Sequence, residues 1–213
     1  MLHISTWIWG EKYGQFYIDR LIAGVSRNVR QPHTFHVFEP EPADKYLTDM
    51  PGCLPRLRSW SPSWQKKHGI ERGERLVTLD LDLIVTGPLD DLFDRPEPFL
   101  ILLGANASNK NPYNGSVQML RAGYRPDVWS DFNVVTLQQS PKHEFYDDQG
   151  WLWYRIPNVA GWTVGAASGV YAFKKPGWPK GDALPVGARL VAFPGHRDPS
   201  QFTNIPWIAE HWR

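Results

Sequence analysis

Several features that mark other classes of protein are scarce or missing in this sequence of 213 residues. Cys53 is the only cysteine, so the chain can form no intrachain disulfide and no cysteine-based zinc site. No stretch reaches the roughly 18 apolar residues that a membrane-spanning helix needs. The first residues, MLHISTWIWGEKYG, lack the basic start and long apolar run of a secretion signal. We therefore expect a cytoplasmic protein without a membrane span.

The charges nearly cancel, with 23 Lys and Arg against 22 Asp and Glu. Such a chain has no strong field to draw it to nucleic acid, so we expect no nucleic-acid partner. Two residue types are abundant instead, with 11 tryptophans and 19 prolines. Tryptophan suits an aromatic core, and it also suits platforms that stack on sugars or bases.

Hydrophobic periodicity predicts one α/β domain that spans residues 1–213. Strands are expected at 2–8, 33–38, 75–80, 99–103, 116–120, 169–173 and 188–193. Helices are expected at 13–29, 63–68, 126–137 and 147–154, and a short one after the GPL turn at 87–89. The rest of 39–73 is rich in Pro, Gly and Ser and favours loops. This order is typical of a mixed, mostly parallel sheet flanked by helices.

The segment RLVTLDLDLIVTGPLDDLF places Asp80 and Asp82 in an otherwise apolar run. Residues two apart on a strand point to the same face. If the strand ends near Asp80, both carboxylates meet at its carboxyl end, where open α/β sheets bind ligands. Such close carboxylates repel one another unless a cation lies between them or one is protonated. The pair therefore suits Mg²⁺ or Mn²⁺ held together with phosphates, or else an edge where both acids reach water or a basic partner.

The same segment resembles the Asp-x-Asp motif of nucleotide-sugar glycosyltransferases with the GT-A fold, and is similar to that of the glycogenin and galactosyltransferase-like family. Four other segments resemble that family in the same order: TWIWGEKYGQFYIDRLIAGVSRNV, NPYNGSVQML, DDQGWL and ARLVAFPGHRDPSQF. The resemblance implies a GT-A-like fold and a metal-dependent glycosyltransferase. The donor would be a nucleoside-diphosphate sugar, and a UDP-sugar is favoured. The acceptor would be a hydroxyl group of a carbohydrate or of another molecule. The cofactor would be Mn²⁺ or Mg²⁺.

The resemblance also implies roles for single residues. Asp80 and Asp82 match the metal- and ribose-binding pair. The resemblance places Thr6, Trp7 and Tyr13 at the nucleotide, and Lys66, with Lys67 an equal candidate, at the diphosphate. It places Asn114, Gly115 and Ser116 at the donor sugar, with Gln149 beside the reacting sugar. Gly195 and Arg197 belong to the closing segment that binds the donor.

Two points of the chemistry stay open. Similar proteins often carry a metal-binding histidine just before the glycine of the closing segment, where this chain has Pro194. His196, after that glycine, is the candidate third ligand, although it could contact phosphate instead. If transfer inverts the anomeric configuration, Asp148 or Asp147 could be the catalytic base. The same two acids also suit the start of a helix.

Two other functions compete with this interpretation. Phosphohydrolases of the haloacid-dehalogenase type also place a nucleophilic aspartate in a D-x-D after an apolar strand, although their motif normally opens the first strand. A protein that binds nucleotide sugars or glycans without catalysis could have the same fold.

Overall fold

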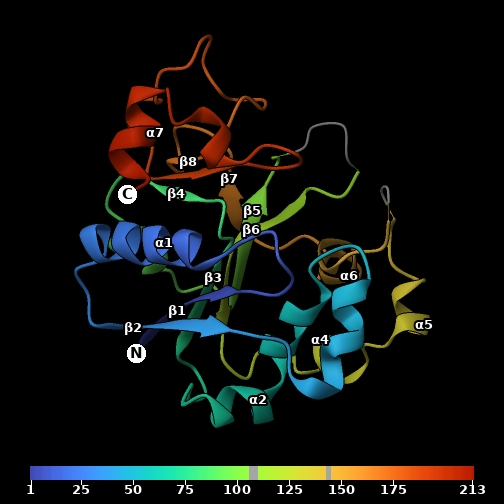
Figure 1. The fold of residues 1–213 in the computed structure, drawn as a ribbon. Coiled ribbons are helices and arrows are strands. Elements are labelled where there is room, and N and C mark those ends of the chain that lie inside the picture. The colour runs from blue at the N-terminus through green and yellow to red at the C-terminus, as the bar shows by residue number, and fades with distance from the viewer. Residues whose placement is uncertain (106–109, 143–144) are drawn as a thin grey trace.

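The computed structural model describes residues 1–105, 110–142 and 145–213, and it is built around a six-stranded sheet (Figure 1). The strand order is β2-β1-β3-β6-β5-β7. The bounds are β1 (Leu2–Trp7), β2 (His33–Phe38), β3 (Arg75–Leu79), β5 (Phe99–Leu103), β6 (Tyr113–Arg121) and β7 (Gly161–Thr163). Only β6 runs against its neighbours, β3 and β5. The expected mixed, mostly parallel sheet is confirmed.

A second, three-stranded sheet has the order β4-β9-β8 and lies beside the last helix of the chain (Figure 1). Its strands are β4 (Ile84–Val85), β9 (Leu190–Ala192) and β8 (Val170–Ala172). Aromatic side chains, among them Phe173, Phe193 and Trp207, form the core between this sheet and the C-terminal segment. The aromatic side chains of the C-terminal segment are therefore packed.

The helices cover both faces of the main sheet (Figure 1). The α-helices are α1 (Gln15–Asn28), α2 (Pro62–Lys67), α3 (Asp90–Phe93), α4 (Asp127–Ser130), α5 (Val134–Leu137), α6 (Asp148–Arg155) and α7 (Pro206–His211); the 3₁₀ helices are η1 (Pro42–Asp49), η2 (Leu54–Trp60) and η3 (Pro199–Phe202). Apolar residues at helical spacing on α1 bury against one face of the sheet, and η2 and α6 pack on the other. Helices therefore pack on both faces of the six-stranded sheet.

Two sequence predictions of local structure are wrong, and two short strands were not predicted. The helix expected over 126–137 is two short helices, because the side chain of Asn133 accepts hydrogen bonds from Val135 N and Thr136 N and starts α5 anew. Residues 39–73 are not mainly loop, since they contain η1 and η2. The strands β4 and β7 were not expected; at two and three residues they are too short to show a period.

Candidate active site

The paired aspartates lie directly after β3, which occupies an inner position of the main sheet. Asp80 N donates to the carbonyl oxygen of Ser116 on β6 at 3.0 Å, and Leu83 N donates to Asp80 O at 3.3 Å. The chain therefore leaves the sheet and turns at Asp80. Both carboxylates lie at the carboxyl end of β3, as expected if the strand ends near Asp80.

Arg56, on η2, ties four segments of the chain together beneath the aspartates. Its Nη1 donates to Asp80 Oδ1 at 2.8 Å and to the carbonyl oxygen of Gly115 at 3.0 Å. Its Nε donates to Asp148 Oδ2 on α6. Arg56 is only 4% exposed, and Asp148 is fully buried. Burial alone would lower the pKa of Arg56, but the carboxylates of Asp148 and Asp80 hold it well above its ordinary value.

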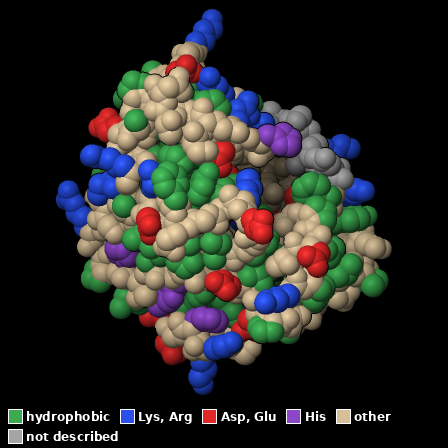
Figure 2. Space-filling model, viewed as in Figure 1, with side chains coloured by type: hydrophobic (Ala, Val, Ile, Leu, Met, Phe, Trp, Pro, Cys, Tyr) green, Lys and Arg blue, Asp and Glu red, His purple; other side chains and the backbone are tan. Residues whose placement is uncertain are grey.

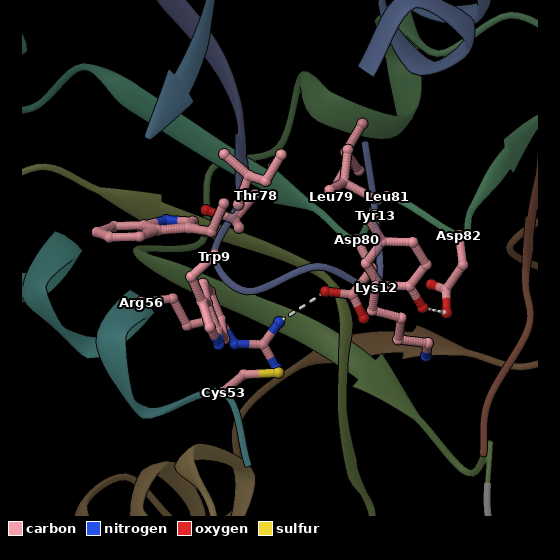
Figure 3. Close-up of a pocket in the computed structure, with 12 residues that line it drawn as sticks. Trp9, Lys12, Tyr13, Cys53, Arg56, Thr78, Leu79, Asp80, Leu81 and Asp82 are labelled. Carbon is pink, nitrogen blue, oxygen red and sulfur yellow. Dashed lines mark hydrogen bonds and ion pairs between the residues drawn. The ribbon is translucent and has the colours of Figure 1, made fainter. Parts of the chain in front are cut away.

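Asp82 has a different partner, on the loop between β1 and α1. Tyr13 Oη donates to Asp82 Oδ2 at 2.6 Å (Figure 3). Burial and the nearby Asp80 raise the pKa of Asp82 to about 7, against the opposing effects of the Tyr13 hydrogen bond and Lys12. The two carboxylates are thus in electrostatic conflict, which positive charge from a ligand or cation would relieve.

Two cavities meet at the aspartates. The central cavity has a volume of about 300 Å³ and is lined by Trp7, Ile8, Trp9, Lys12, Tyr13, Cys53, Arg56, Thr78, Leu79, Asp80, Leu81 and Asp82. The inner cavity has a volume of about 150 Å³ and is lined by Cys53, Arg56, Asp80, Asp82, Asn114, Gly115, Ser116, Gln149, Phe193, Pro194 and Gly195. Residues Cys53, Arg56, Asp80 and Asp82 belong to both. An elongated ligand could therefore pass from one cavity to the other over the two carboxylates.

The wall of the inner cavity depends on a close approach between β6 and α6. Gly115 N donates to Gln149 Oε1 at 3.2 Å, and Gln149 Nε2 donates to Asp147 Oδ2 at 3.2 Å. The expected sugar-binding residues on β6 thus lie together with Gln149 and, from the closing segment, Gly195.

The two acids considered as a catalytic base have structural partners. Asp147 caps α6, where its Oδ1 accepts from Gly150 N at 2.7 Å. Asp148 pairs with Arg56, and its Oδ1 has no hydrogen-bond partner in the described part of the chain. Neither residue lines the central or the inner cavity.

Comparison with known proteins now adds to this geometry. No protein-family model and no curated protein sequence matches the chain. Solved structures do match. A glycosyltransferase involved in glycosylation of the major capsid of PBCV-1 is 14% identical with a TM-score of 0.57, over 96% of this chain and 98% of that chain. The galactosyltransferase LgtC, in complex with donor and acceptor sugar analogs, is 10% identical with a TM-score of 0.55, over 100% and 97%. The apo form of GlyE from Streptococcus pneumoniae TIGR4 is 12% identical with a TM-score of 0.61, over 93% of this chain and 55% of that chain.

The chain has the GT-A fold. It spans nearly the whole of LgtC and about half of GlyE. The TM-scores establish a shared fold, whereas identities of 10–14% do not establish a shared activity, so the activity of these neighbours enters only as part of the function proposed below.

Within this GT-A fold, the structure brings some of the expected site residues together and leaves others apart. Trp7 and Tyr13, the candidate nucleotide-binding residues, line the central cavity. Thr6 is fully buried and lines neither cavity, and Arg197 is half-buried and lines neither. Lys66 is exposed on α2, away from both cavities.

Other basic residues replace Lys66 beside the cavities. Lys67, its equal candidate, is exposed and pairs with Glu41 at 2.7 Å. Arg56 and Lys12 are the basic residues that line the central cavity, and the sequence analysis missed both. A signal for Arg56 existed in LPRLRSW, because an arginine among buried apolar residues needs a carboxylate partner.

The donor set fits a divalent cation only in part. Among residues 1–105, 110–142 and 145–213, no three His, Cys, Asp or Glu side chains are grouped to hold a metal ion. His196 is exposed and lines neither cavity. Two carboxylates at the junction of the cavities fit Mg²⁺ or Mn²⁺ that is shared with ligand phosphates. They do not fit a metal that the protein holds alone.

The face of the molecule in Figure 2 carries scattered basic and acidic side chains between patches of hydrophobic ones. No single continuous basic surface dominates this face. In the described part of the chain, no helix has the length and apolar character needed to cross a bilayer.

Proposed function

We propose that this chain is a glycosyltransferase that moves a sugar from a nucleoside-diphosphate sugar to a hydroxyl group of a carbohydrate or another acceptor. A UDP-sugar is the favoured donor, and Mn²⁺ or Mg²⁺ the cofactor. The observation that carries the proposal is the Arg56 network, which links Asp80, Gly115 and Asp148 where the two cavities meet. The GT-A fold shared with solved glycosyltransferases supports it.

In this proposal the donor lies along the two cavities. The nucleoside occupies the central cavity, whose walls include Trp7, Trp9 and Tyr13. The diphosphate crosses Asp80 and Asp82, and the sugar enters the inner cavity beside Gly115 and Gln149. Backbone and amide groups of that wall are suited to hydrogen-bond sugar hydroxyls.

Charge at the junction matches the reaction. When the bond between sugar and nucleotide breaks, negative charge develops on the leaving diphosphate. A divalent cation held by Asp80 and Asp82 would act as a Lewis acid on that charge. Lys12 and the buried guanidinium of Arg56 add fixed positive charge beside it, in a site where burial strengthens electrostatic interactions.

Asp148 acts in this proposal through Arg56. Its carboxylate is buried and bound to the guanidinium, so it orients Arg56 toward Asp80 and the sugar. Asp147 serves as the cap of α6 and as a hydrogen-bond acceptor for Gln149. These partners favour a reaction in which the leaving phosphate takes the proton of the acceptor, because neither acid lines the inner cavity.

Release of nucleoside diphosphate from a panel of sugar nucleotides, with and without Mn²⁺, tests the function. We expect release that depends on both the sugar nucleotide and the metal. Hydrolysis of simple phosphate monoesters without preference for a nucleotide would instead support a phosphohydrolase. Tight nucleotide binding without turnover, across varied acceptors, would support a binding protein.

A further inference from the structure

A third hollow, which we call the outer groove, lies at the carboxyl ends of β1 and β2. It has a volume of about 450 Å³, and its lining includes Ile8, Trp9, Glu39 and Lys45. The strands β1 and β2 are parallel, with Trp7 opposite Phe38, and Ile8 N donates to Phe38 O at 2.9 Å. Glu39 follows β2 at once, so the pairing of the two strands places it next to the segment that carries Trp9.

The outer groove adjoins the central cavity, because Ile8 and Trp9 line both. In the proposed function, which this inference deepens, the diphosphate lies at Asp80 and Asp82. The base is the end of the donor farthest from the sugar, so it extends toward Trp9. Figure 3 shows Trp9 on the opposite side of the cavity from Asp82 and Tyr13. The indole offers a broad apolar face on which a base can stack.

Glu39 and Lys45 supply the polar groups of the groove. Both side chains are exposed, and neither forms an ion pair or side-chain hydrogen bond with any described residue. Glu41, two residues farther along, differs in that it is bound to Arg58 and Lys67. Glu39 and Lys45 are therefore available to a ligand. An ionised carboxylate only accepts hydrogen bonds, and an ammonium group only donates them.

This pair of groups distinguishes two kinds of base. Uracil and guanine each present a ring N–H beside a carbonyl oxygen. Cytosine and adenine present a ring nitrogen that accepts, beside an amino group that donates. A carboxylate and an ammonium group complement the first pattern. The carboxylate meets the lone pair of the ring nitrogen in the second, which is unfavourable.

We propose that Glu39 and Lys45 select the base of the donor. Glu39 accepts a hydrogen bond from the ring N–H, and Lys45 donates one to the neighbouring carbonyl. The site then takes uracil or guanine nucleotides in preference to cytosine or adenine nucleotides. Trp9 contributes stacking that is common to all four bases.

Equilibrium binding of UDP, GDP, CDP and ADP, measured by calorimetry in the presence of Mn²⁺, tests this inference without any acceptor. We expect UDP or GDP to bind the unmodified protein about tenfold or more tightly than CDP and ADP. In Glu39→Gln the ratio should fall to about threefold or less, because an amide can also donate to the ring nitrogen. Lys45→Met should weaken UDP and GDP alone, whereas Trp9→Ala should weaken all four nucleotides alike.

Glu11→Gln is the matched control, since Glu11 is an exposed acid on the same loop as Trp9 and lines none of the three hollows. The Glu11→Gln variant should keep the full preference for UDP or GDP over CDP and ADP. Equal affinity of the four nucleotides for the unmodified protein, or an unchanged ratio in Glu39→Gln, would overturn the inference and leave the proposed function standing. If none of the four nucleotides binds, both are overturned.

Discussion

The backbone of Gly115 passes so close to Arg56 that a β-carbon at this position would lie 1.8 Å from Nη2 of the guanidinium. Arg56 is buried and held by Asp80 and Asp148, so it cannot move aside freely. Glycine at position 115 is therefore a requirement of the site rather than of the strand. The first prediction follows from this contact.

Gly115→Ala should displace Arg56 and reduce nucleotide release from the preferred sugar donor by about a hundredfold or more, because a misplaced charged group loses its effect on the leaving diphosphate. Steady-state kinetics measures the loss, and circular dichroism should show that the fold persists. Gly14→Ala is the control, since a β-carbon there meets nothing within 4 Å. Full activity in Gly115→Ala would contradict the role of Arg56.

Arg56→Ala should lower the free energy of unfolding by about 3–5 kcal/mol, because it leaves the carboxylate of Asp148 buried without a partner. Urea denaturation measures the change. Adding Asp148→Asn to this variant should restore part of the stability, since the uncompensated charge is then gone. Additive losses in the double variant would show that the two side chains are not coupled.

Asp82→Ala should abolish the Mn²⁺-dependent part of nucleotide binding while the fold stays intact. Among the described residues, Asp80 and Asp82 are the two carboxylates that line both cavities, so we expect the remaining aspartate to hold a cation weakly. Calorimetric titration of UDP with and without Mn²⁺ measures this, and Asp49→Ala, at an exposed position, serves as the control. An unchanged affinity for UDP in the presence of Mn²⁺ would remove Asp82 from the metal site.

His196→Ala should leave the affinity for Mn²⁺ in the presence of UDP unchanged. The imidazole is exposed and lines neither the central nor the inner cavity, so we expect the diphosphate rather than this side chain to complete the coordination. Electron paramagnetic resonance of Mn²⁺ titrated into the UDP complex measures the affinity. A tenfold or larger loss would restore His196 as the third ligand.

Stability should fall in mild acid because of His36 on β2. Burial and the neighbouring His3 and His68 lower the pKa of His36 from 6.5 to about 4. Below about pH 6.5 the unfolded chain therefore takes up a proton that the folded chain refuses, and the free energy of unfolding falls until about pH 4. Above pH 6.5 the group is neutral in both states and contributes no slope.

Urea denaturation at pH 7.5 and pH 5, compared between the unmodified protein and His36→Gln, isolates this effect. His3 lies between His36 and Glu74 and is hydrogen-bonded to both. The pKa of Glu74 is lowered to about 2, so protonation of this carboxylate affects stability at a lower pH than protonation of His36 does. The variant should lose less stability between the two pH values. An equal loss in both proteins would assign the pH dependence to other groups.

Much of the fold could be predicted from the sequence because it is encoded by short-range periodicity. The apolar spacing of α1 and the alternation of β1 and β3 repeat within a few residues, and both elements form as expected. The end of β3 at Asp80 follows in the same way. The order of the five resembling segments indicates the GT-A fold.

The long-range contacts of the site could not be predicted in this way. Arg56 lies 24 residues from Asp80 and 92 from Asp148 in the sequence, and no local pattern joins them. Lys66 was expected near the diphosphate from its position before the aspartates, yet α2 carries it to the surface. The composition of 104–114 is typical of a loop that could determine specificity, and its residues 106–109 lie outside the described residues.

By itself, the sequence determined the α/β class, the strand that leads to Asp80 and Asp82, and the location of that pair at the carboxyl end of the strand. Only the tertiary structure decided that Arg56 pairs with Asp80, why position 115 is glycine, and that Glu39 lies next to Trp9. The physical reason is that hydrophobic periodicity acts between neighbours in the chain. Ion pairs, close backbone approaches and cavity walls depend on segments that meet only after the sheet has assembled.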